Sequence, residues 1–216
     1  MTIGVVTVAH GATYRSFLPE WAGSIAGLQR QPEAITMIVD DINCDHVGEA
    51  TEQLGGRGII IEMPEFTGNT PHVLANEAIR FTDTDWICRL DVDDLLYPHA
   101  FNPLDSWAAD ICGFGLSING VTNLLPPRAS ARDILASPHN LLFAASPFRR
   151  EVWAETPGFL DIAYNDWAFW RACARIGATF ATTGTIDYLY RQHNESTTSR
   201  VRHDEEVQAM LRSEGQ

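Results

Sequence analysis

The stretch Trp86-Ile87-Cys88-Arg89-Leu90-Asp91-Val92-Asp93-Asp94 places three carboxylates directly behind an apolar run. A buried strand that ends in Asp-x-Asp-Asp presents acidic oxygens at the edge of a sheet, where a divalent cation and a diphosphate can meet. Side chains two apart in an extended segment lie on the same side, so we expect Asp91 and Asp93 to converge on one ion. Asp94 then points away and has a structural role. Such clusters also form ordinary turns and N-caps, so the rest of the chain must decide.

Length and composition fit one compact α/β domain. The chain has 216 residues, of which 45% are hydrophobic and 20% charged, enough to bury a single core. The apolar residues 1–9 lack a basic flank and are too few for a membrane span or a signal peptide, so we interpret them as a buried strand. The cysteines show no Cys-x-x-Cys spacing, which argues against a zinc site or a disulfide framework and favours reducing cytoplasm. They are Cys44, Cys88, Cys112 and Cys173.

The charged residues exclude some chemistry. All 15 basic residues are arginine, so a lysine Schiff base and a Gly-Lys-Ser/Thr phosphate loop are absent. The net charge is −13, but residues 1–127 carry 5 Arg against 17 Asp and Glu, whereas residues 128–216 carry 10 against 11. The acidic half suits a cation, and the arginine-rich half suits phosphates or an anionic acceptor. A chain this acidic lacks the electrostatic footprint of nucleic-acid binding, which makes a nucleic-acid acceptor unlikely without excluding it.

Strand-like apolar segments alternate with amphipathic segments in the first half, a pattern typical of a mostly parallel sheet. We expect strands at residues 2–9, 34–40, 58–63 and 86–90, and helices at 17–29, 46–54 and 71–80. In such sheets the ligand lies beyond the carboxyl ends of the strands. Those ends carry His10-Gly11, Asp40-Asp41 and Asp91-Val92-Asp93, so we expect three polar tips to meet in one crevice.

The alternation fails after Asp94. We expect strand pieces at 111–114, 116–118, 141–146 and 186–191, and a helix over 165–176 closed by Gly177. Ser130-Ala131-Arg132-Asp133 predicts a capping box at the start of a short helix. Residues 204–212 are expected to form a surface helix.

The order of these motifs resembles the family 2 glycosyltransferases, which have a GT-A fold, along nearly the whole chain. The matching pieces, in order, are Val5–Ala9 with His10-Gly11, Ile38–Asp41, Gly68–Thr70 with Leu74–Ile79, Asp91–Asp94, Phe148–Trp153 with Gly158-Phe159, Asn165–Trp170 and Tyr190–His193. The resemblance implies a single Rossmann-like α/β domain over 1–216. Within it, residues 1–94 hold the nucleotide-sugar and metal half, 95–203 the acceptor and catalytic-base half, and 204–216 a terminal helix.

The resemblance also implies an activity. It is metal-dependent, inverting transfer of one sugar from a nucleoside-diphosphate sugar, preferably a UDP-sugar, to an acceptor hydroxyl on a glycan, small molecule or macromolecule. Asp166 would be the base that deprotonates this hydroxyl. Asp91, Asp93 and His193 would hold Mn²⁺ or Mg²⁺, with Asp91 shared between the metal and the ribose.

Further roles follow from the resemblance. Asp40 and Asp41 match the pair that reads the base and ribose of the donor, and Thr7, Val8 and Ala9 would line the base pocket through backbone groups. Asn76 and Arg191 would also contact the donor. Trp167 would contact the acceptor by stacking on a sugar.

The chain departs from the family pattern at two positions and leaves alternatives open. Ala75 stands where the family usually has Arg, so that donor contact is either missing or supplied by Arg80 or Arg89. Asn165 replaces the usual Glu before the catalytic Asp. Without a Gln-x-x-Arg-Trp sequence or a following membrane helix, single addition is favoured over processive synthesis. The alternatives are a nucleotidyltransferase, although Gly11–Arg15 is too poor in glycine for its phosphate loop, and a non-catalytic nucleotide-sugar binding module.

Overall fold

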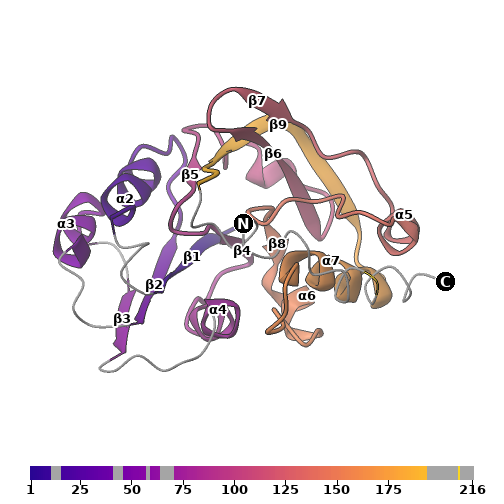
Figure 1. Ribbon diagram of the computed structural model, residues 1–216, viewed down its shortest axis with the longest axis horizontal. Helices are drawn as coiled ribbons and strands as arrows, with labels where there is room; N and C mark the ends of the chain where they lie inside the picture. Colours follow the sequence, from indigo (N-terminus) through magenta and orange to yellow (C-terminus); the bar gives the residue numbers. More distant parts are fainter. Residues whose placement is uncertain (11–15, 41–45, 57–58, 64–70, 194–208, 210–216) are drawn as a thin grey trace.

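The computed structural model describes residues 1–10, 16–40, 46–56, 59–63, 71–193 and 209 (Figure 1). Within this part, helices pack on both faces of one twisted sheet, as predicted for an α/β chain. The strand order in the sheet is β3-β2-β1-β4-β8-β6-β9-β5, with β7 paired to β6. The predicted helix over 204–212 lies outside the described residues except for Ala209.

The first half of the chain is a parallel, doubly covered sheet. Its strands are β1 (Ile3–His10), β2 (Ala34–Asp40), β3 (Ile59–Met63) and β4 (Trp86–Arg89), and its helices are α2 (Leu18–Ala26), α3 (His46–Gln53) and α4 (Pro71–Arg80). Alternate side chains of β1 go to opposite faces: Ile3 and Val5 pack with α2 and α3, whereas Val6 packs with α4. Figure 1 shows α2 and α3 on one side of these strands and α4 on the other. Burial on both faces explains why these strands read as continuous apolar runs.

The carboxyl end of β1 lies where the strand order reverses. β1 pairs with β2 from Gly4 to His10, but with β4 only from Ile3 to Val6, and the Leu90 amide donates to the Val6 carbonyl (3.0 Å). Beyond Val6, β1 stays paired with β2 but is no longer paired with β4, because the chain after Leu90 turns away from β1. A crevice at such a switch point is the usual ligand site of an open α/β sheet.

The second half adds a mixed set of strands and short helices. The strands are β5 (Leu95–Leu96), β6 (Ile111–Ile118), β7 (Thr122–Leu124), β8 (Phe148–Arg149) and β9 (Phe180–Tyr190). The helices are α5 (Ala131–Ala136), α6 (Arg150–Ala154) and α7 (Asn165–Arg175), with a 3₁₀ turn η1 at Leu104–Ser106. The long ladders are parallel, including β6 with β9, and the antiparallel ladders are short. The sheet is therefore mostly parallel, as predicted.

Most predicted elements are confirmed within a few residues. The capping box is present, because the Ser130 hydroxyl accepts from the Asp133 amide and the Asp133 carboxylate accepts from the Ser130 amide. Three cysteines, Cys88, Cys112 and Cys173, are buried free thiols, as expected. Cys44 and Gly58 lie outside the described residues.

The predicted strand at 141–146 is wrong. Its apolar residues form a turn, in which the Ser146 amide donates to the Phe143 carbonyl (3.0 Å), and the strand that enters the sheet is β8. The Ser146 hydroxyl instead accepts from the Phe114 amide of β6 (3.2 Å). The two pieces at 111–114 and 116–118 are one strand, β6, with irregular register around Gly115. The late strand starts at Phe180, six residues before the predicted start.

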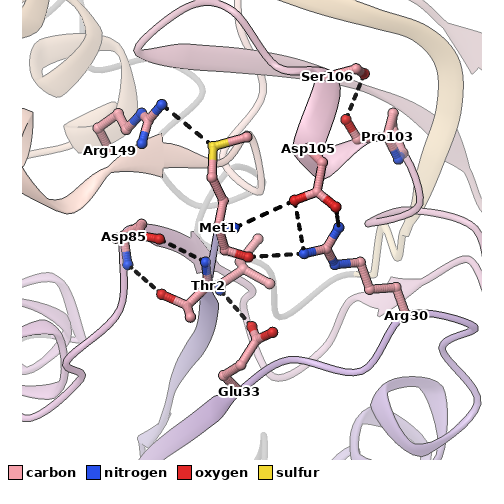
Figure 2. Close-up of polar contacts among 10 residues, drawn as sticks. Met1, Thr2, Arg30, Glu33, Asp85, Pro103, Asp105, Ser106 and Arg149 are labelled. Carbon is pink, nitrogen blue, oxygen red and sulfur yellow. Dashed lines mark hydrogen bonds and ion pairs between the residues drawn. The ribbon is translucent and has the colours of Figure 1, made fainter.

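A polar brace fixes the amino end of β1, at the opposite end of the sheet from the switch point (Figure 2). The Thr2 amide donates to Asp85 (2.7 Å), and the Asp85 amide donates to the Thr2 hydroxyl (2.9 Å). These hydrogen bonds hold the pKa of the Asp85 carboxyl below its usual value. Arg30 joins the Met1 carbonyl to Asp105 (2.9 and 2.6 Å). The brace ties β1 to the loops on either side of it.

Candidate active site

The carboxylates after β4 stand on a turn, not on an extended segment. The Asp94 amide donates to the Asp91 carbonyl (3.0 Å), which closes the turn. The segment is therefore not extended, and the prediction that Asp91 and Asp93 lie on the same side is wrong. The prediction that Asp94 points away from the site is also wrong. Asp91 and Asp94 both line a cavity of about 330 Å³, whereas Asp93 does not.

Asp93 instead contacts His193. The His193 Nε2 lies 3.0 Å from Asp93 Oδ2, and the Asp93 side chain is 13% exposed. Burial and the neighbouring Asp91 raise the pKa of the Asp93 carboxyl, and the hydrogen bond with His193 opposes the rise. The structure thus brings together two of the three predicted metal ligands, from segments 100 residues apart in sequence.

Arg191 fastens the end of β9 to this turn. Its amide donates to Asp94 Oδ1 (2.9 Å), its Nε donates to the Asp93 carbonyl, and its Nη1 donates to Glu20. The guanidinium also lies 4.6 Å from the ring centroid of Phe17. The guanidinium predicted to contact the donor is therefore held against protein groups here.

Asp94 is buried and repelled by its neighbours. Burial, Asp93 and Asp91, in that order, raise the pKa of the Asp94 carboxyl well above its usual value. Three carboxylates gathered on one turn favour a bound cation, because the cation would offset their mutual repulsion. Within the described residues, however, no three His, Cys, Asp or Glu side chains form a metal-binding cluster by themselves.

Asp166 lies on the first turn of α7 and faces the same cavity as Asp91 and Asp94. The Asn140 amide donates to Asp166 Oδ2 (2.8 Å), and Asn140 Oδ1 accepts from the Leu142 amide (3.3 Å). Burial raises the pKa of the Asp166 carboxyl, against the hydrogen bond from the Trp167 amide and the charge of Arg89. A half-buried carboxylate with a raised pKa in a cavity has the chemical character of a general base.

Arg89 links the turn after β4 to the start of α7. It is 5% exposed, donates from Nη1 to Asn165 Oδ1 (2.6 Å) and from Nη2 to Asp91 Oδ1 (3.0 Å). The Asn165 amide in turn lies 3.2 Å from His72 Nε2. Of the two arginines proposed to replace the family's donor contact, Arg89 lines the cavity, whereas Arg80 is exposed and pairs with Glu77.

Asn76 has a structural role in the described residues, and its predicted donor contact stays a prediction. Its Oδ1 accepts from Trp153 Nε1 (3.0 Å) and from the Phe159 amide (2.9 Å), and its Nδ2 donates to the Phe159 carbonyl (2.8 Å). The side chain therefore fastens α4 to the loop between α6 and α7. Gly158 is in the left-handed region (φ 72°), and a Cβ there would lie 2.4 Å from Asn76 Oδ1.

Trp167 is buried (4% exposed) and does not line the cavity, so its predicted acceptor contact is not supported. It packs with Ala168, Ile162 and Tyr164. The aromatic side chains that do line the cavity include Tyr164, two residues before Asp166, together with Phe143, Tyr188 and Tyr190.

The predicted base pocket is at the switch point. Thr7, Val8 and Ala9 occupy the part of β1 that extends beyond its pairing with β4, and none of them lines the cavity described above. Asp40 ends β2 beside His10, and Asp41 lies outside the described residues. The donor roles of these residues stay predictions.

Sequence reasoning missed Asn140 and Tyr164. Asn140 lies 26 positions before Asp166 in a loop without a motif. Tyr164 directly precedes the Asn165-Asp166 pair, but nothing in its residue type predicts that its ring enters the cavity. Only the folded arrangement identifies either residue.

Known structures resemble this chain in fold. The crystal structure of S. aureus TarS 1-349 in complex with UDP has a TM-score of 0.72 and 14% identity, covering 100% of this chain and 65% of that one. For the TarS 1-349 complex with UDP-GlcNAc the TM-score is 0.72 at 14% identity, with coverages of 92% and 61%. The mannosyltransferase PcManGT from Pyrobaculum calidifontis, in complex with GDP-Man and Mn²⁺, gives 0.64 at 15% identity, with coverages of 93% and 59%.

The fold is GT-A. This confirms the predicted fold class, and at these identities the likeness shows the fold alone. The chain spans less than two thirds of the length of these structures. No protein-family model and no curated protein matches the sequence. No helix in the described part of the GT-A fold has the length and apolar character needed to cross a membrane.

Proposed function

We propose that this protein is a metal-dependent inverting glycosyltransferase that moves one sugar from a nucleoside-diphosphate sugar to an acceptor hydroxyl. The observation that carries the proposal is one cavity in a GT-A fold that is lined by Asp166 together with Asp91 and Asp94. A base and an acidic turn that face a shared space match the requirements of displacing a diphosphate by a hydroxyl.

Asp166 would accept the proton of the acceptor hydroxyl. Its Oδ2 is engaged by Asn140, which orients the carboxylate (2.8 Å). The raised pKa of the Asp166 carboxyl suits a base that must take a proton near neutral pH. Because Asn165 is neutral, no second carboxylate adjoins the base in sequence, and Asn165 instead accepts from Arg89.

The donor would lie across the switch point. Thr7, Val8 and Ala9, together with Asp40 and Asp41, would bind the base and ribose. Asp91 would contact the ribose from the end of β4. Arg191 would contact the diphosphate, which requires its guanidinium to exchange the Asp93 carbonyl and Glu20 for phosphate oxygens. We favour a UDP-sugar, and support comes from the similar TarS structures with UDP and UDP-GlcNAc, although PcManGT binds GDP-Man.

A divalent ion, Mn²⁺ or Mg²⁺, fits the acidic turn. Asp93 and His193 would hold it from the protein side, with Asp91 close by, and diphosphate oxygens would complete the shell, as is usual for nucleotide-bound ions. The 3.0 Å contact of a buried carboxylate with an imidazole suits a shared ion, and an imidazole ligand favours Mn²⁺. When bound, the ion would stabilise the charge of the departing diphosphate.

The proposal is tested by thermal shift with UDP-, GDP-, dTDP- and CDP-sugars, each with and without Mn²⁺. Stabilisation by one nucleotide that requires Mn²⁺ would identify the donor by linkage. The matching donor is then incubated with the enzyme, and release of the free nucleoside diphosphate is followed. The absence of any nucleotide-dependent shift would contradict the proposal.

A further inference from the structure

Tyr164 is held at the cavity by its backbone and by Trp167. It adopts a left-handed conformation (φ 57°, ψ 36°) directly before α7, where a bulky residue is uncommon. Strained residues of this kind concentrate at functional sites. The Trp167 ring meets the Tyr164 ring edge to face, with centroids 6.5 Å apart and planes at 89°. The buried Trp167 thus acts as a support that fixes a partly exposed aromatic ring beside Asp166.

The rest of the cavity wall divides into an apolar and an acidic part. Leu116, Leu142 and Phe143 contribute apolar surface. The acidic part is formed by Asp91, Asp94 and Asp166. Among the residues that the structure describes, Arg89 is the arginine that lines the cavity, and it is already bonded to Asp91 and Asn165. An anionic group that entered would therefore lie among carboxylates in a space of low dielectric constant, without a free guanidinium from the described part of the chain to meet it.

We propose that Tyr164 determines acceptor specificity, by packing against the apolar face of an uncharged sugar ring whose hydroxyl faces Asp166. A pyranose presents C–H groups on its faces and hydroxyls at its rim, which matches an apolar wall with Asp166 and Asn140 at one end. A sugar that carries a carboxylate, such as a uronate, is disfavoured by repulsion from Asp166, which lies outside the turn proposed to hold the ion. The inference rests on the glycosyltransferase function proposed above.

Three variants separate the ring from the backbone and from the hydroxyl. Tyr164→Asn removes the ring and keeps a residue that tolerates the left-handed region, so the fold is retained. Tyr164→Phe keeps the ring and removes the hydroxyl. Tyr97→Asn is the matched control, because Tyr97 does not line the cavity and stacks with His99 instead.

Each variant is assayed with the donor found by thermal shift. The acceptors are four neutral p-nitrophenyl pyranosides (glucoside, galactoside, mannoside and N-acetylglucosaminide), with p-nitrophenyl glucuronide as the charged counterpart of the glucoside. For the best neutral acceptor, Tyr164→Asn should raise KM about tenfold, whereas Tyr164→Phe and Tyr97→Asn should stay within about twofold of wild type. UDP affinity and the slow hydrolysis of the donor by water should be unchanged in all three. The glucuronide should be a poor acceptor.

Unchanged acceptor KM in Tyr164→Asn would overturn the inference, as would a glucuronide accepted as well as the glucoside. Donor hydrolysis by the wild type without transfer to any neutral pyranoside would overturn it too, while leaving the proposed function in place. A wild-type protein that neither binds nucleotides nor hydrolyses nucleotide sugars would remove both proposals.

Discussion

The carboxylates around the cavity differ in environment, and their environments separate their roles. Asp91 has a 46% exposed side chain paired with Arg89, which suits contact with an incoming ligand. Asp94 is buried and bonded to the Arg191 amide, which suits a role in shaping the turn. Among the hydrogen bonds of the described residues, Asp93 contacts the imidazole of His193, and Asp166 accepts from the side-chain amide of Asn140.

Removal of Asp93 tests the ion site at the residue scale. Asp93→Ala should abolish the Mn²⁺ dependence of UDP binding, because the ion loses an anionic ligand and the diphosphate meets the remaining charge of Asp91. His193→Ala should weaken Mn²⁺ binding only when UDP is present, because the diphosphate supplies the other ligands. Isothermal titration of UDP with and without Mn²⁺ measures both. Asp83→Ala, an exposed carboxylate at the other end of the sheet, is the control. Retained Mn²⁺-dependent UDP affinity in Asp93→Ala would refute the assignment.

Asn140 should set the pH dependence of the reaction. The base must be ionised, so the rate falls as the pH drops through the Asp166 pKa, which burial raises above the ordinary value of 3.8. The Asn140 hydrogen bond lowers that pKa. Asn140→Ala should therefore move the acid limb of the kcat/KM profile to higher pH, and Asn102→Ala, a surface asparagine bonded to Gln29, should not. An unmoved acid limb in Asn140→Ala would show that Asn140 does not act on the base.

At the scale of elements, the site depends on how α4, α7 and the loop between α6 and α7 are joined. Asn76 makes two hydrogen bonds to Phe159 of that loop and one to Trp153 of α6, and Arg89 crosses from β4 to the first turn of α7. Phe159 links the two connections, since its backbone bonds to Asn76 and its ring lies 4.6 Å from the Arg89 guanidinium. The first turn of α7, with Asp166, is positioned through these contacts.

Gly158 offers a direct test of the contact between the loop and Asn76. Gly158→Ala should destabilise the fold more than Gly120→Ala. Both glycines have φ near +72°, but a Cβ at Gly158 meets Asn76 at 2.4 Å, whereas a Cβ at Gly120 meets nothing within 4 Å. Strain alone costs about 1–2 kcal/mol. The clash and the lost hydrogen bonds should add about 1–3 kcal/mol for Gly158→Ala. Urea unfolding measures the difference, and equal free energies of unfolding for the two variants would contradict the proposed junction.

The sequence correctly predicts those helices and strands whose ends are marked by neighbouring residues. The helix over 71–80 was predicted with its true bounds, because Pro71 marks its start. The helix predicted over 165–176 ends one residue earlier, and Gly177 marks that end. The strand expected at 141–146 failed because a short apolar run is also compatible with a buried turn. The turn at Asp91–Asp94 is also held by Arg191, 97 positions after Asp94, which no local pattern encodes. The direction of the Tyr164 ring depends on a left-handed backbone and on packing with Trp167, which the residue types do not specify.

At the scale of the whole molecule, the two halves of the sheet supply different parts of the candidate site. In the first half, β1 and β4 meet at the switch point, with β2 parallel to β1 on its other side (Figure 1). The second half contributes Asp166, Asn140 and Tyr190, the last residue of β9, to the cavity. The GT-A likeness to TarS and PcManGT extends over more than nine tenths of this chain, so it includes both halves. The proposed function therefore requires that a substitution can remove proton transfer while donor binding is retained.

Asp166→Asn tests that separation most directly. We predict that the variant binds the UDP-sugar and Mn²⁺ as the wild type does, while transfer falls by about 10²–10⁴-fold, because the base acts only in the transition state. Its melting temperature should not fall: with its pKa raised in the fold, the ionised Asp166 disfavours folding at neutral pH, and the amide removes that cost. Titration calorimetry, thermal unfolding and initial transfer rates on one preparation decide the matter. Loss of donor affinity or of the fold, or transfer at the wild-type rate, would contradict the account.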